Sequence, residues 1–206
     1  MNMADIVENP EAYFRAMMPE RDSLLRALEA EAESESIPIV GPVVGELLFV
    51  LARATQAKNI LELGTATGYS AIYLGRGCEP AEGRVLSLEY DAELAERARK
   101  NIALANLSQT VSVFEANVIE ALPELAGPYD FVFMDIEKQD YGVALGHLEA
   151  IVRPGGLLIA DNTAFKDADA FNQAIFSAPG WQSVQILAYL PMHSGLHDGL
   201  CFAVRL

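Results

Sequence analysis

The stretch from Asn59 to Tyr73 limits the possible folds of this chain more than any other. A short apolar run that contains Glu62 is broken by Gly64 and Gly68, and a helix-like apolar pattern then begins. This order predicts a strand, a tight turn and a helix, which together open a parallel α/β unit. Because the two glycines stand four residues apart, the turn does not match the dinucleotide-binding pattern G-x-G-x-x-G.

Two carboxylates accompany this turn. Glu62, at the carboxyl end of the predicted strand, is a candidate acceptor for an ammonium group. Glu89 closes a second apolar run about 20 residues past the turn, where a carboxylate commonly binds ribose hydroxyls. A nucleoside that carries an amino acid would use both groups, so the pattern predicts an S-adenosylmethionine site. The alternative is an ordinary strand-to-helix turn with two acidic strand ends.

The rest of the chain continues the alternation of strands and helices. With 206 residues it is of a size for one domain, and the alternation predicts an α/β fold with one doubly wound sheet. Residues 1–40 are expected to form an N-terminal helical extension, packed either on the sheet or on a second subunit, and residues 41–206 to form the core. Further strands are predicted at 85–88, 110–114, 129–134, 157–160, 184–190 and 200–204, and helices at 10–34, 43–54, 92–105, 138–151 and 168–177.

The composition narrows the class of protein. No apolar run reaches the roughly 20 residues that span a bilayer, and the first residues lack the basic and apolar regions of a secretion signal. Cys78 and Cys201 are far apart and have no metal-type spacing, so a reducing cytoplasm is expected. The net charge of −15 disfavours nucleic acid as a partner, because proteins usually bind phosphate backbones with clustered Lys and Arg.

Polar side chains collect where the predicted strands end, although apolar strands have no structural need of them there. In doubly wound sheets, ligands bind outside the carboxyl ends of the strands. Carboxylates gathered at that edge would repel one another, so a positively charged group is expected among them. The residues are Glu62, Glu89, Asn117, Asp135, Asp161 and Asn162.

Three of these residues can converge as oxygen ligands, because Asp135 ends one strand and Asp161 and Asn162 end another. Two carboxylates and an amide carbonyl suit a hard divalent cation, with Mg²⁺ foremost and Ca²⁺ or Mn²⁺ as alternatives. Asp-Asn is also a common turn pair. Lys138, three residues after Asp135, would be a usable base beside a metal and a sulfonium, and a purely structural lysine is the alternative.

Four segments in this order resemble the cation-dependent O-methyltransferases, a family that includes the catechol and caffeoyl-CoA enzymes. They are LELGTATGYS at 61–70, DIEKQDY at 135–141, GGLLIADN at 155–162 and DGL at 198–200, and the likeness runs from Ile37 to the C-terminus. The resemblance implies a seven-stranded, mostly parallel sheet with an antiparallel last strand, and a homodimer is expected. It also implies Lys138 as base, Asp135 in catalysis, a metal at Asp135, Asp161 and Asn162, and cofactor contacts from Glu62, Gly64, Gly68, Ser70, Glu89 and Asp135.

The chain departs from the family pattern at three places. Asn117 stands where the family often has an aspartate, so it is expected to make the adenine-end contact. The loop at 163–167 replaces a longer loop that carries a tryptophan, and His197 precedes the terminal Asp198 in place of a glycine. His193 and His197 lie near the expected acceptor pocket. These differences fall where the acceptor should bind and leave its identity open.

Three functions remain in competition. The first is metal-dependent methylation of a small molecule with neighbouring hydroxyls, catechol-like or caffeoyl-like. The second is methylation of a hydroxylated uridine in tRNA, since residues 36–40 and the glycine turn resemble bacterial relatives of that kind, although the acidic charge opposes it. The third is a non-catalytic, dimeric S-adenosylmethionine-binding module. Such a module would have lost the metal ligands or the base, and this chain keeps all four residues.

Overall fold

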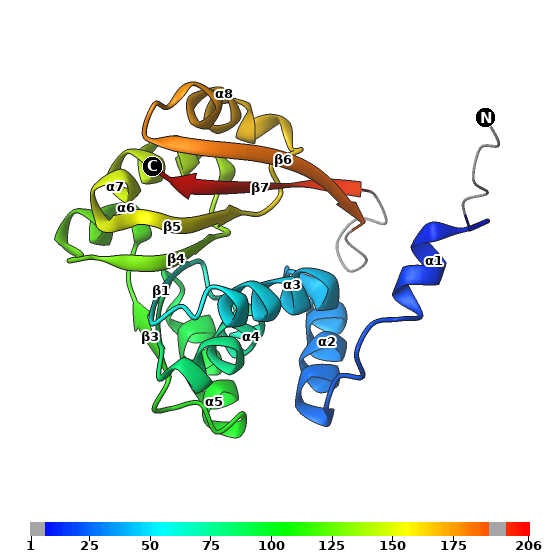
Figure 1. Ribbon diagram of the computed structural model, residues 1–206. Coiled ribbons are helices and arrows are strands. Elements are labelled where there is room, and N and C mark those ends of the chain that lie inside the picture. The colour runs from blue at the N-terminus through cyan, green and yellow to red at the C-terminus, as the bar shows by residue number, and fades with distance from the viewer. Residues whose placement is uncertain (1–6, 190–196) are drawn as a thin grey trace.

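Seven strands form one sheet in the computed structural model, which describes residues 7–189 and 197–206 (Figure 1). The strand order is β3-β2-β1-β4-β5-β7-β6. The first five strands are parallel, and β7 runs antiparallel to both β5 and β6. This confirms the predicted sheet and its antiparallel last strand. The strands are β1 Asn59–Leu63, β2 Arg84–Glu89, β3 Val111–Glu115, β4 Tyr129–Met134, β5 Val152–Ala160, β6 Trp181–Tyr189 and β7 His197–Arg205.

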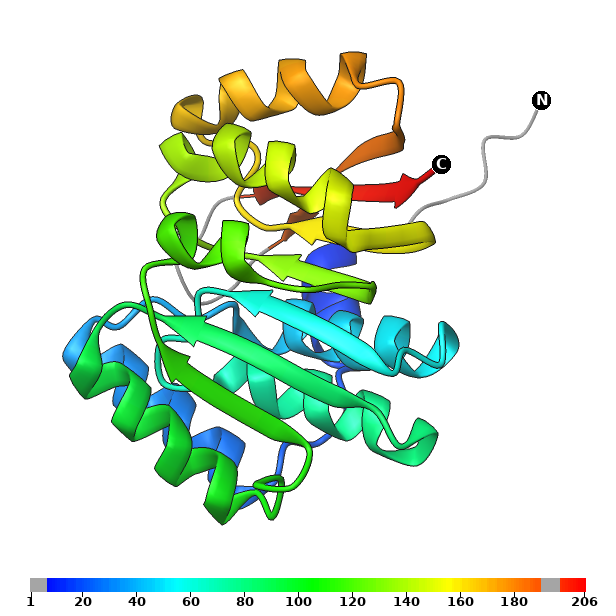
Figure 2. The ribbon, with the colours of Figure 1, turned by 90° about the vertical axis from the view of Figure 1, so that its left-hand side faces the viewer.

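Helices cover both faces of the sheet (Figures 1 and 2). Successive residues of β1 face opposite sides, so Ile60 joins a core that includes α2 to α5, and Leu61 joins one that includes α6 to α8. Short 3-10 turns precede two of the helices, η3 (Lys138–Asp140) and η4 (Lys166–Ala168). The helices are α1 Pro10–Arg15, α2 Ser23–Glu35, α3 Gly41–Ala54, α4 Tyr69–Cys78, α5 Ala92–Leu104, α6 Val118–Ala121, α7 Tyr141–Ile151 and α8 Asp169–Ser177.

The single helix predicted at 10–34 was wrong, because the structure has two helices there. Pro19 disfavours helical backbone in the residue before it, and α1 ends at Arg15. A new helix then begins after Asp22, whose carboxylate accepts a hydrogen bond from the backbone N–H of Leu25 at 2.9 Å. Asp91 caps α5 in the same way, since its carboxylate accepts hydrogen bonds from the N–H groups of Glu93 and Leu94.

The second N-terminal helix, α2, packs against the helical layer on one face of the sheet, and Figure 2 shows it beside α5. Arg97 of α5 forms ion pairs with Glu31 and Glu35 of α2. The Tyr69 hydroxyl, at the start of α4, donates to Glu29 at 2.6 Å. By contrast, α1 buries none of its residues and stands away from the sheet in Figure 1. No helix within the described residues is long and apolar enough to cross a membrane.

Candidate functional site

The candidate site lies at the carboxyl ends of β1, β2, β4 and β5, where the strand order reverses between β1 and β4. The parallel register brings Leu63 level with Met134, and Met134 level with Ala160. Backbone hydrogen bonds continue past the strand ends, since the N–H of Asp135 donates to the Leu63 carbonyl at 2.8 Å and that of Asp161 donates to the Met134 carbonyl at 3.0 Å. Residues far apart in the sequence therefore reach one edge of the sheet.

Both glycines of the turn are required by its geometry. Gly64 has a φ of +92°, and a Cβ atom there would lie 2.1 Å from the carbonyl oxygen of Asp135. Gly68 has a φ of +89°, and a Cβ atom there would lie 3.3 Å from Ala98 of α5. The first glycine thus lets β1 approach the end of β4, and the second lets α4 begin against α5.

Glu89 holds this turn in place. Its Oε2 accepts hydrogen bonds from the N–H groups of Thr65 at 3.1 Å and Ala66 at 2.8 Å, and its Oε1 accepts from the N–H of Asp91 at 3.0 Å. An ionised carboxylate has about four acceptor positions, so capacity remains for a ribose hydroxyl. The sequence pattern predicts only the ribose role, and the contact with the turn is additional.

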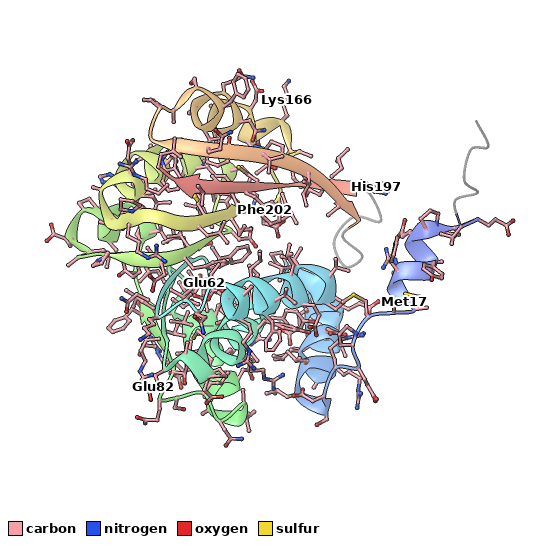
Figure 3. All side chains as sticks on the ribbon, viewed as in Figure 1. Met17, Glu62, Glu82, Lys166, His197 and Phe202 are labelled. Atoms are coloured by element: carbon pink, nitrogen blue, oxygen red, sulfur yellow. The ribbon has the colours of Figure 1, made fainter. Side chains whose placement is uncertain are left out.

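Glu62 is fully buried, and Figure 3 shows it at β1 within the protein. Ser87 donates a hydrogen bond to its Oε2, while its Oε1 has no hydrogen-bond partner among the described residues. Burial raises the pKa of Glu62 to about 8, the negative charges of Asp135 and Glu89 add to this, and the nearby hydroxyl groups of Ser70 and Ser87 oppose it. An unpaired buried carboxyl oxygen is costly. The ammonium group of an amino-acid-bearing cofactor would supply the missing partner, so the residues fit such a cofactor.

Asn117 has a structural role that the sequence pattern did not reveal. Its Oδ1 accepts hydrogen bonds from the N–H groups of Ile119 at 2.9 Å and Glu120 at 3.3 Å, which makes it the N-cap of α6. The side-chain oxygen is therefore already engaged. What Asn117 can still offer to an adenine ring is its NH₂ group.

The three expected cation ligands lie at the ends of β4 and β5. Asp161 is 1% exposed, and its Oδ1 accepts a hydrogen bond from the N–H of Asn162 at 2.8 Å. Burial raises the pKa of Asp161 well above its usual range, and the negative charge of Asp135 raises it further. Asn162 has a left-handed φ of 52°, and its Nδ2 donates to Asp198 at 2.8 Å.

The donor chemistry of this set fits a hard divalent cation. Within residues 7–189 and 197–206, no three His, Cys, Asp or Glu side chains group together to hold a metal ion. The expected set contains two carboxylates, and its third ligand is the amide oxygen of Asn162. Oxygen donors of this kind suit Mg²⁺, which commonly keeps several waters. A cation would also offset the repulsion that raises the pKa of Asp161.

Lys138 lies beside the expected cation ligands. Its Nζ lies 2.8 Å from Asp135 Oδ1, donates to the Ile136 carbonyl at 3.0 Å and sits 5.3 Å from the centre of the Tyr141 ring. The helix predicted from Lys138 begins as the 3-10 turn η3 and becomes α-helical at Tyr141. The buried Tyr141 hydroxyl contacts the carbonyl oxygens of Met134 and Asp161, a link that no sequence pattern indicates.

Only part of the expected acceptor pocket lies within the described residues. His197 is exposed at the start of β7, where Figure 3 shows it. His193 lies outside the described residues. The sequence motif at 198–200 includes Asp198 without assigning it a role, and the structure places Asp198 against Asn162.

The comparison with known proteins decides the family. Residues 19–173 match the protein family described as "O-methyltransferase". The chain belongs to the O-methyltransferase family. This O-methyltransferase is 40% identical to a catechol O-methyltransferase of Niastella koreensis over 163 residues, which cover 76% of this chain and 73% of that protein. It is 35% identical to a catechol O-methyltransferase of Mycobacterium tuberculosis over 155 residues, which cover 74% of this chain and 70% of that protein.

Solved structures agree with the sequence comparison. An O-methyltransferase from Bacillus cereus in complex with SAH superposes on this chain with a TM-score of 0.85 at 28% identity, over 95% of this chain and 96% of that chain. These similarities confirm the family resemblance and the methyltransferase fold. The protein is an S-adenosylmethionine-dependent O-methyltransferase.

Proposed function

We propose that this O-methyltransferase uses a divalent cation, Mg²⁺ foremost, to methylate a small acceptor with two neighbouring hydroxyls, of the catechol or caffeoyl type. The observation that carries the proposal is the grouping of Asp135, Asp161 and Asn162 at two adjacent strand ends, with the amine of Lys138 2.8 Å from Asp135. The two relatives named catechol O-methyltransferase support the acceptor class. Ca²⁺ and Mn²⁺ have the same oxygen preference and are the alternative cations.

In this proposal the cofactor binds across β1 and β2. Glu62 accepts the ammonium group of S-adenosylmethionine through Oε1, which has no partner in the part of the chain that the structure describes. Glu89 accepts a ribose hydroxyl while it continues to hold the N–H groups of Thr65 and Ala66. Gly64 and Gly68 shape the turn between these two carboxylates, Ser70 at the start of α4 contacts the cofactor, and Asn117 gives its NH₂ group to the adenine end. Asp135 borders both the cofactor and the cation.

Lys138 is proposed as the general base. A bound divalent cation would act as a Lewis acid that acidifies a hydroxyl of the acceptor. Lys138 would accept the hydroxyl proton at Nζ, which lies 2.8 Å from the Asp135 carboxylate that would hold the cation. The oxygen freed of its proton then attacks the methyl carbon, and the bond from that carbon to the sulfonium breaks.

The loop after Asn162 is proposed as one wall of the acceptor pocket. Its backbone is fixed, since the N–H of Thr163 donates to the Gly199 carbonyl at 2.9 Å and Asn172 of α8 donates to the Thr163 carbonyl at 2.7 Å. Phe165, three residues after Asn162, is 53% exposed. An exposed aromatic ring on a fixed loop offers a face on which an aromatic acceptor can stack.

A homodimer is also proposed. The short helix α1 leaves Tyr13 and Phe14 exposed, with Met17 just after it (Figure 3), and the edge strand β6 exposes Ile186 and Leu187. Exposed apolar groups on an arm and on a sheet edge suit contact with a second copy. Light scattering coupled to size exclusion measures the mass, and a monomer at micromolar concentration would contradict the proposal. The buried free thiols of Cys78 and Cys201 suit a reducing cytoplasm, where the enzyme is proposed to act.

One panel of acceptors separates the competing functions. Purified enzyme is given S-adenosylmethionine and Mg²⁺ with catechols, hydroxycinnamoyl thioesters or tRNA that lacks the final uridine methylation. Methylation of the catechols or thioesters alone supports the proposal. Methylation of tRNA alone would establish the tRNA alternative despite the net charge of −15. Cofactor binding without any methyl transfer would indicate the non-catalytic module.

A further inference from the structure

Asp198 links the last strand of the chain to the candidate cation site. It is 5% exposed, and it accepts three hydrogen bonds from residues that the structure describes. Its Oδ2 accepts from Asn162 Nδ2 at 2.8 Å, and its Oδ1 accepts from the N–H groups of Ala164 at 3.2 Å and Gly199 at 2.6 Å. None of the ion pairs within the described residues includes Asp198. This carboxylate is therefore stabilised by donors around the Asn162 loop.

The hydrogen bond to Asp198 sets the orientation of the Asn162 amide. An ionised carboxylate only accepts hydrogen bonds, so the part of the amide that faces Asp198 must be the NH₂ group. The amide is planar, and its carbonyl oxygen consequently points away from Asp198. Gly199, the residue after Asp198, packs closely on the same loop, because a Cβ atom there would lie 2.6 Å from Thr163 Oγ1 and 2.7 Å from the backbone nitrogen of Ala164.

We propose that Asp198 is the positioning residue of the cation site, which turns the carbonyl oxygen of Asn162, and not its NH₂ group, toward the cation shared with Asp135 and Asp161. The inference rests on the cation in the proposed function and adds a residue to it. Partners that orient a metal ligand in this way commonly change metal affinity by about 10- to 100-fold. The start of β7 thereby contributes to a site whose ligands all lie on other strand ends.

The substitution Asp198→Asn tests the inference because it keeps the shape of the side chain. The new carbonyl oxygen stays with the two backbone N–H donors, so the new NH₂ group faces Asn162. Asn162 must then turn its amide over in order to accept, which brings its own NH₂ group toward the cation. We expect Mn²⁺ affinity, measured by calorimetry with SAH bound, to fall at least about tenfold. Affinity for SAH itself should change little.

The decisive comparison exchanges the two residue types, with Asp at position 162 and Asn at position 198. In Asn162→Asp, two carboxylates face each other, and adding Asp198→Asn restores a donor between them. We therefore expect Asp198→Asn to weaken Mn²⁺ binding in the wild-type background and to leave it unchanged or strengthen it in the Asn162→Asp background. An equal loss in both backgrounds, or no loss in either, overturns the inference. The matched control is Asp167→Asn, the same change at an exposed position five residues after Asn162, which should have no effect.

The Mn²⁺ measurements also separate failure of the proposed function from failure of this inference. If the wild type with SAH binds no Mn²⁺ at millimolar concentration, both the cation in the proposed function and this inference fail. If the wild type binds Mn²⁺ and Asp198→Asn binds it equally, only the inference fails. If circular dichroism shows that Asp198→Asn does not fold, the test uses the wild-type protein with isotope-labelled asparagine. Adding Mg²⁺ should then shift the NMR signal of the Asn162 side-chain carbonyl carbon, and an unchanged signal overturns the inference.

Discussion

The Nζ of Lys138 lies 2.8 Å from Oδ1 of Asp135, so the proposed base and a proposed cation ligand form one ion pair. Without a metal, the ammonium group of Lys138 balances the charge of Asp135. A divalent cation at the same carboxylate would compete with that pairing. The geometry thus couples the proposed base and the proposed cation through one carboxylate.

This coupling predicts a selective loss in Lys138→Met, which keeps an apolar side chain beside the Tyr141 ring. We expect turnover to fall by about 10²–10⁴-fold, the range for removal of a general base, while affinities for SAH and Mn²⁺ change little. Steady-state kinetics and calorimetry measure the two effects. Lys100→Met, at an exposed position of α5, is the control. A Lys138→Met enzyme with normal turnover would show that another group takes the proton.

Glu89→Ala should weaken cofactor binding and loosen the glycine turn together. The substitution removes the acceptor of three backbone N–H groups, and each hydrogen bond to a charged group is worth roughly 1.5–3 kcal/mol. We expect SAH affinity to fall more than about tenfold by calorimetry, with a lower midpoint of thermal unfolding. Glu115→Ala is the matched control, because Glu115 pairs with Glu89 in the sheet register but is exposed. Equal SAH affinities in the two variants would be inconsistent with this role.

The raised pKa of Glu62 predicts that the stability of the ligand-free enzyme depends on pH. Its pKa in the folded protein is about 8, above the ordinary value of 4.5, so the folded state binds more protons than the unfolded state between these pH values. Stability contributed by protonated Glu62 is therefore present below about pH 4.5 and is lost as pH rises through about 8.

The test compares urea unfolding of the wild type and Glu62→Gln from pH 5 to pH 9 without cofactor. We expect the variant to lack this part of the pH dependence and to be more stable than the wild type at pH 9, by an amount of the order of a few kcal/mol. It should also bind SAH poorly. Glu33→Gln, at an exposed position of α2, should behave as the wild type. The same pH profile in wild type and Glu62→Gln would rule out this assignment.

Gly64→Ala should destabilise the protein, because the added Cβ would lie 2.1 Å from the Asp135 carbonyl oxygen and φ is +92°. The strained backbone alone costs of order 1–3 kcal/mol, and the clash adds to it. Gly142→Ala in α7 is the matched control, since a Cβ there meets nothing within 4 Å. It should stabilise the protein by about 0.5–1 kcal/mol. If urea unfolding shows Gly64→Ala to be more stable than Gly142→Ala, this geometry of the turn is contradicted.

The sequence predicts the sheet well because its signals are local. The apolar run of β4, Tyr129–Met134, ends where predicted, and the glycines mark the turn after β1. Residues that end parallel strands must meet at one edge, so the grouping of Asp135 with Asp161 also follows from the pattern. The start of α7 was less predictable, because one turn of 3-10 helix follows the same residue pattern as an α-helix.

Contacts between distant segments could not be predicted in this way. Asp198 and Asn162 are separated by 36 positions, and only the antiparallel pairing of β7 with β5 brings them together. An asparagine such as Asn117 is suited both to contact a ligand and to cap a helix. In the structure its side-chain oxygen accepts from the N–H of Ile119 and caps α6. The pairing of Glu89 with the glycine turn depends on the register of β1 with β2.

The central claim is that a divalent cation positions an acceptor with two neighbouring hydroxyls for methylation. Turnover of catechol and of phenol, measured side by side with Mg²⁺ and with excess EDTA, tests it most directly. We expect catechol to be methylated with Mg²⁺ and at least about 100-fold more slowly with EDTA, and phenol to be a poor acceptor throughout, because it cannot chelate. Full turnover of catechol in EDTA, or phenol methylated as fast as catechol, would contradict the claim.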